Sequence, residues 1–153
     1  MDTFITVQDV LDKSRRFHRQ LMEFYNRLSR ESDRERLRLL LDYMRRHEDR
    51  FTRELARYEN EGQKRLLETW LQYGPDDQPL DLPPVHEIAD DMSLDDIQAV
   101  ALRFDAALAA FYADAARRVM SDDARELFHN LVQEHEADKA TIRKNVESAK
   151  HDM

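Results

Sequence analysis

A chain of 153 residues can form one domain with a substantial core, and its lack of cysteine excludes disulfides, zinc–thiolate sites and thiol catalysis. The net charge is −8, and the arginines are interleaved with Asp and Glu, which is typical of solvated helix faces rather than of a nucleic-acid surface. No apolar stretch has the length of a membrane span and no secretory signal is visible, so we expect a cytoplasmic protein that binds neither nucleic acid nor membranes.

Apolar residues recur at helical spacing along most of the chain. The predicted helices cover residues 7–30, 33–60, 94–120 and 122–149, with an extra helical stretch near 63–73. Residues that can cap a helix precede the four long helices: Thr6, Ser32 or Asp33, Ser93, and Ser121 or Asp122. All four prolines lie between residues 74 and 84, where they interrupt helical structure.

The connections between the helices predict how they pack. The turns near residues 31 and 121 are short, so each joins an antiparallel pair of helices, whereas residues 62–92 form a long crossover between the pairs. We therefore predict an all-α protein, with residues 1–153 forming a single antiparallel four-helix bundle domain that has one long crossover between helices 2 and 3. The two halves also resemble each other: residues 17–25 align with residues 104–112, and residues 40–47 align with residues 128–135 when one residue is inserted.

Polar residues interrupt the apolar stripe of each predicted helix near its middle. They are His18, His47, Asp105, His135 and Asp138. Because a helix rises about 1.5 Å per residue, their distances from the two turns place them within about one helical turn of a common level.

Buried polar groups need partners, and two explanations supply them. In one, the three imidazoles and two carboxylates hold one metal ion, which the ligand types leave open as Fe, Mn or Zn. In the other, they form a metal-free hydrogen-bonded network in which the charge of Arg50 replaces that of a cation.

The segments around Phe24-Tyr25 and Phe111-Tyr112, with the helices that follow them, resemble the rubrerythrin-type branch of the ferritin-like superfamily. That resemblance implies a bundle in which helices 1 and 3 each supply a Glu, and helices 2 and 4 each supply Glu-x-x-His, to hold two irons. Here the corresponding positions are His18, Asp105, the stretch from His47 to Arg50, and the stretch from His135 to Asp138. The resemblance thus points to a ferritin-like bundle whose metal site is degenerate and has been remodelled.

Three functions are compatible with this sequence. The first is a ferritin-like protein whose remodelled His/Asp site binds one metal ion or none and which is not a di-iron enzyme. The second is a redox or oxygen-handling metalloenzyme with an unusual His/Asp site. The third is a metal-free helical module that binds a protein partner. A homodimer is compatible with each of them.

Overall fold

The computed structural model of the chain describes residues 5–61, 64–71 and 92–151 and contains the four predicted long helices. Their bounds are α1 (Val7–Glu31), α2 (Glu35–Glu61), α5 (Leu94–Arg118) and α6 (Asp122–His151). Each helix buries one stripe of side chains and leaves the opposite face to solvent, the pattern expected for a bundle. The predicted fold class is confirmed.

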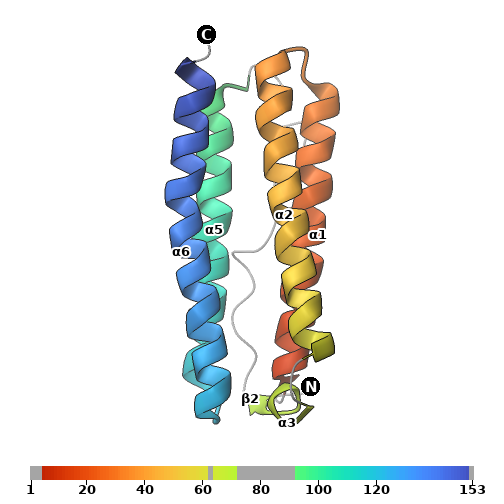
Figure 1. Cartoon of the computed structure of the whole chain (residues 1–153), viewed down its shortest axis with the longest axis vertical. Helices are drawn as coiled ribbons and strands as arrows, with labels where there is room; N and C mark the ends of the chain where they lie inside the picture. The colour runs from red at the N-terminus through yellow and green to blue at the C-terminus, as the bar shows by residue number, and fades with distance from the viewer. Residues whose placement is uncertain (1–4, 62–63, 72–91, 152–153) are drawn as a thin grey trace.

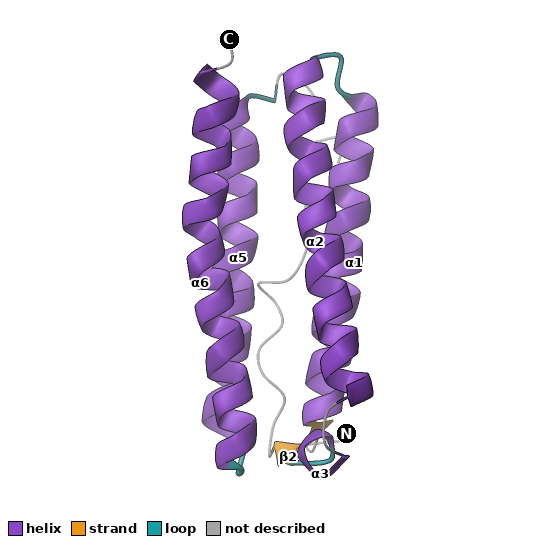
Figure 2. Cartoon of the chain, viewed as in Figure 1, coloured by secondary structure: helices purple, strands orange, loops and turns teal. Residues whose placement is uncertain are grey.

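The four helices form two antiparallel hairpins that lie side by side, α1 with α2 and α5 with α6 (Figure 1). The turn that joins α1 to α2 and the turn that joins α5 to α6 lie at opposite ends of the bundle (Figure 2). Helices α2 and α5 therefore begin at the same end, so the end of α2 and the start of α5 lie at opposite ends of the bundle. Most of the predicted crossover, residues 62–63 and 72–91, lies outside the described residues.

Side-chain caps begin three of the four long helices. Thr6 and Asp9 form a capping box at the start of α1, and Ser93 and Asp96 form an equivalent box at the start of α5. At α6 the Ser121 hydroxyl accepts a hydrogen bond from the backbone N–H of Ala124 at 3.3 Å. Helix α2 starts two residues later than predicted.

The extra helical stretch predicted near 63–73 is confirmed for residues 64–67 and wrong for residues 68–71, while residues 63, 72 and 73 lie outside the described part of the chain. Helix α3 (Lys64–Leu67) has four residues, and Trp70–Leu71 then form strand β2, which pairs antiparallel with β1 (Ile5–Thr6). The apolar spacing of Leu66, Leu67, Trp70 and Leu71 is compatible with a helix. Backbone pairing with the segment before α1 replaces that helix, and Leu71 is fully buried as a result. In the described part of the chain, no helix is apolar and long enough to cross a membrane.

The internal repeat is visible in the aromatic core. Phe24 and Tyr25 meet edge to face with ring centroids 5.7 Å apart, and Phe111 and Tyr112 meet in the same way at 5.7 Å. Phe104 packs between the hairpins against Phe24, at 6.2 Å, and against a second aromatic ring of α1. Apolar packing of this kind surrounds the middle of the bundle, where the polar side chains lie.

Candidate functional site

The five residues singled out from the sequence are all buried in the bundle. They come from every long helix: His18 from α1, His47 from α2, Asp105 from α5, and His135 and Asp138 from α6. None of them is more than 8% exposed. Hydrogen bonds and ring contacts connect them, so the structure brings all five together; whether they bind metal stays a prediction. We call this group, together with Glu48, the polar layer.

Glu48 is the member of the polar layer that sequence reasoning missed. It is 8% exposed, and its Oε2 is hydrogen-bonded to Nδ1 of His18 across the first hairpin. Its position in the sequence contained a usable signal, because Met44, Glu48, Phe51 and Leu55 follow the spacing of one helix face. The alignment of the two halves obscured that signal, since it matched His47 with His135.

The contacts give a different match between the halves. His18 bonds to Glu48, thirty residues later, and Asp105 bonds to His135, also thirty residues later, with 2.8 Å between Asp105 Oδ1 and His135 Nδ1. Each hairpin therefore carries one histidine–carboxylate pair. The order is reversed between them: the histidine is on the first helix of one hairpin and on the second helix of the other.

Stacked rings join the two pairs. The imidazoles of His18 and His135 lie 5.4 Å apart with 17° between their planes. The Phe51 ring packs on both, at 5.1 Å from His18 and 4.5 Å from His135. Tyr112 stacks on His135 at 5.6 Å, and its hydroxyl is hydrogen-bonded to the buried Ser14. The histidines are therefore held in place by aromatic rings as well as by carboxylates.

His47 connects the two hairpins by another route. Its Nε2 is hydrogen-bonded to Oδ1 of Asp138 on α6. Its Nδ1 lies 3.0 Å from Nη2 of Arg50, one turn later on α2. Both ring nitrogens are therefore engaged, unlike those of His18 and His135.

The two aspartates differ in protonation. Burial and the neighbouring carboxyl group of Asp138 raise the pKa of Asp105 to about 10. Burial alone would raise the pKa of Asp138 as well, but hydrogen bonding to His47 and Asp105 outweighs burial and lowers it. When two carboxyl groups share a site, the proton is held by one of them. At neutral pH Asp105 carries this proton and Asp138 is ionised.

Burial keeps the two stacked histidines neutral. It lowers the pKa of His18 to about 3, with the neighbouring His47 contributing, and it lowers the pKa of His135 well below the usual value. Burial also raises the pKa of Glu48 to about 8. Neutral imidazoles can offer a lone pair to a metal ion, whereas imidazolium ions cannot.

Four buried atoms of the polar layer are bonded to none of the other described residues outside their own set: His18 Nε2, His135 Nε2, Asp105 Oδ2 and Asp138 Oδ2. Within the described residues the two nitrogens have no partner at all, and the two aspartates interact only with each other through these oxygens. Two nitrogen and two oxygen donors suit one divalent transition-metal ion such as Zn²⁺, Fe²⁺ or Mn²⁺. Within residues 5–61, 64–71 and 92–151, however, no three His, Asp or Glu side chains are already arranged as a metal ligand set. The donor types fit one ion, but binding it would require these side chains to move and Asp105 to lose its proton.

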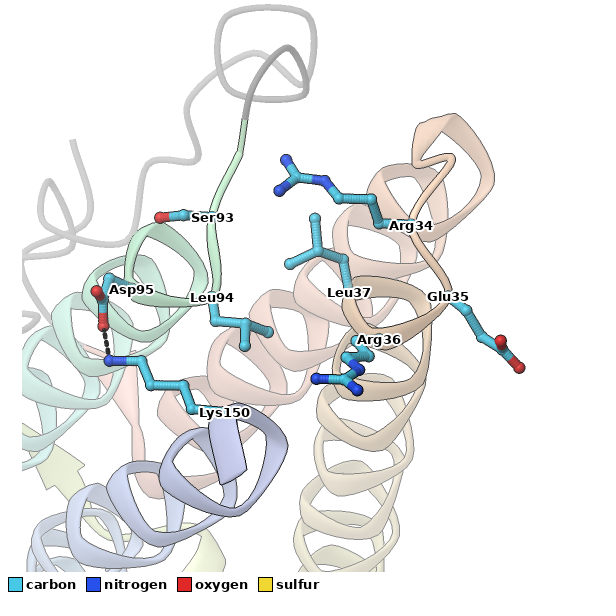
Figure 3. Close-up of a pocket in the computed structure, with 8 residues that line it drawn as sticks. All are labelled: Arg34, Glu35, Arg36, Leu37, Ser93, Leu94, Asp95 and Lys150. Atoms are coloured by element: carbon cyan, nitrogen blue, oxygen red, sulfur yellow. Dashed lines mark ion pairs between the residues drawn. The ribbon is translucent and has the colours of Figure 1, made fainter. Parts of the chain in front are cut away.

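A separate pocket of about 590 Å³ lies where the N-terminal ends of α2 and α5 approach the C-terminal end of α6 (Figure 3). Its lining is Arg34, Glu35, Arg36, Leu37, Ser93, Leu94, Asp95 and Lys150. Asp95 and Lys150 form an ion pair in this lining, and Glu35 points away from it. No residue of the polar layer borders this pocket, so it gives no access to the buried donors.

No family model and no curated protein matches the chain. A solved structure that does match is the 2.30 Å crystal structure of a candidate ferritin-like diiron-carboxylate protein from Thermotoga maritima. The alignment covers 100% of both chains with a TM-score of 0.66 and 15% sequence identity. The fold is ferritin-like. At this identity the likeness extends to the fold alone.

Proposed function

We propose that this ferritin-like protein binds one divalent metal ion in the polar layer, through His18, His135, Asp105 and Asp138. What supports the proposal is the pair of neutral, buried histidines that each bond to a carboxyl group through Nδ1 and have an unpartnered Nε2. A histidine that ligates a metal usually has its other nitrogen bonded to a carboxylate or carbonyl in this way.

A carboxylate-bridged pair of irons, as in the family that the sequence resembles, does not fit these residues. Such a site uses about four carboxylates and two histidines with free nitrogens. The polar layer has three carboxyl groups, those of Glu48, Asp105 and Asp138, and Glu48 is already bonded to His18. On α2, both nitrogens of His47 are engaged and Arg50 brings a fixed positive charge. A second divalent ion would be poorly compensated in this interior.

The burial of the donors favours a metal ion that stabilises the fold over a catalytic ion that acts on a large substrate. The four proposed ligands are at most 5% exposed. They come from α1, α5 and α6, so a bound ion would connect the two hairpins. It would supply a Lewis acid or, as iron or manganese, a redox centre.

Metal analysis tests this proposal directly. The protein, purified without chelators and then stripped, is titrated with Co²⁺, which reports ligation through its visible spectrum, and with Zn²⁺. We expect one equivalent per chain and a higher melting temperature with metal, because an ion that binds only the folded state stabilises it. His135→Gln should abolish binding, whereas the exposed His129→Gln should not. No binding would favour the metal-free network, and two tightly bound ions per chain would favour the metalloenzyme.

A further inference from the structure

Arg50 has an unusual position for an exposed side chain. It extends back toward the polar layer, and its Nη2 lies 3.0 Å from Nδ1 of the buried His47. Its charge also reaches Glu134 on α6, where it opposes the rise in pKa that burial and Glu54 produce. The guanidinium thus lies near the junction of α2 and α6.

This contact fixes the protonation of the His47 ring. A guanidinium has donors and no acceptor. In the hydrogen bond between Arg50 and His47, Nδ1 must therefore be the acceptor, so it carries no proton. The ring proton is then on Nε2, which donates to Oδ1 of Asp138.

We propose that Arg50 is a positioning residue that locks His47 in the Nε2–H tautomer, directs that proton to Asp138 and takes the place of a second metal ion. The role of Arg50 in limiting the number of bound metal ions rests on the proposed function, whereas its effect on the tautomer of His47 does not. Once Arg50 is bonded to Nδ1, His47 has no nitrogen left for a metal. A second metal ion would also be repelled by the guanidinium of Arg50, which keeps its positive charge because it does not lose its proton in proteins.

Nitrogen-15 NMR of the imidazoles in the metal-free protein tests the tautomer. In the wild type we expect His47 to show an unprotonated Nδ1 and a protonated Nε2. Arg50→Met keeps the apolar stem and removes the donor, so Nδ1 of His47 should become protonated in part of the population. The control is Arg53→Met: Arg53 lies on the same helix, its side chain is 77% exposed, and its ion pair is with Asp49 rather than with the polar layer. It should leave the His47 signals unchanged.

The metal count gives a second measurement on the same proteins. We expect wild type and Arg53→Met to bind one Co²⁺ each, and Arg50→Met to bind a second equivalent about tenfold more weakly than the first. A protonated Nδ1 in the wild type, unchanged His47 signals in Arg50→Met, or a single Co²⁺ in Arg50→Met would each overturn the inference. If the wild type binds no Co²⁺, the proposed function is wrong, and the NMR comparison still decides the role of Arg50.

Discussion

His18 and His135 face each other between the two hairpins with their ring centroids 5.4 Å apart, and each is bonded through Nδ1 to a carboxyl group thirty residues away. The arrangement follows from the internal repeat. Each hairpin supplies one histidine and one acid at the same level, and the order of the two is reversed between the hairpins. The Nε2 atoms of both rings have no partner among the described residues, and they are the nitrogen donors that the proposed metal ion would use.

Introducing the ligand types of the resembled family, a histidine and a glutamate, at two positions of the polar layer and its edge should increase metal binding. In the double variant Arg50→His and Asp105→Glu, the fixed charge is removed, a new imidazole is added to α2, and a longer carboxylate replaces Asp105. We expect this variant to bind two Co²⁺ ions per chain and the wild type to bind one, measured by titration and by elemental analysis. Arg46→His with Asp105→Glu is the control, because Arg46 forms its ion pair with Asp42 on the surface. If the double variant binds no more metal than this control, Arg50 is not what limits the metal content.

Periodicity predicted the fold well because the long helices have nearly continuous apolar stripes and conventional caps. The same reasoning located five buried polar residues, since a histidine or aspartate on an apolar stripe is conspicuous. It missed Glu48, which is next to His47 in the sequence. The comparison of the two halves was shifted by one residue, so it matched His135 with His47 instead of with Glu48. It also missed β2, because the pairing of Trp70–Leu71 with Ile5–Thr6 joins segments that are distant in sequence.

The bond between Ser14 and Tyr112 should show strong coupling in a double-mutant cycle. Both residues are fully buried, and their hydroxyl groups bond to each other across the hairpins. Removing one partner leaves a buried hydroxyl without a partner, which costs about 1–3 kcal/mol. We expect Ser14→Ala and Tyr112→Phe each to lower the free energy of unfolding by about that amount. The double variant should lose no more than the worse single variant. Additive losses in urea unfolding would mean that the two hydroxyls do not depend on each other.

The two obvious substitutions of Glu48 should differ in severity. Glu48→Ala leaves a cavity and leaves His18 Nδ1 without its partner, which together should cost roughly 2–4 kcal/mol of unfolding free energy. Glu48→Gln keeps the size of the side chain and one hydrogen-bonding group for His18, so we expect a loss of about 1 kcal/mol. Chemical denaturation at pH 7 measures both. Glu136→Ala is the control, because Glu136 is exposed and lies on α6 outside the layer. Equal losses for the Ala and Gln variants would show that the carboxyl group, which both variants lack, determines the contribution of Glu48, and that the packing retained by Gln does not.

A second carboxylate cluster, between α1 and α2, should make stability depend on pH. The Glu59 side chain is 5% exposed and lies 2.8 Å from Arg15. Burial and the neighbouring Asp12 raise the pKa of Glu59 from 4.5 to about 7, although Arg15 and Arg19 oppose the shift. Because the folded state holds this proton more tightly than the unfolded chain does, Glu59 contributes stability that is fully present below about pH 4.5 and is lost as the pH rises through about 7.

The amide of Glu59→Gln cannot lose a proton. The loss of stability that ionisation of Glu59 causes as the pH rises should therefore be absent from this variant. Glu48 and Asp105 also have raised pKa values, and the wild-type curve contains their contributions as well. The informative quantity is therefore the difference in unfolding free energy between Glu59→Gln and wild type, measured in urea from pH 4.5 to pH 8. We expect this difference to move in favour of the variant as the pH rises and to level off above pH 7. The exposed Glu61→Gln, at the end of the same helix, should give a flat difference. A flat difference for Glu59→Gln as well would mean that Glu59 is ionised at neutral pH and that its ion pair with Arg15 outweighs its burial.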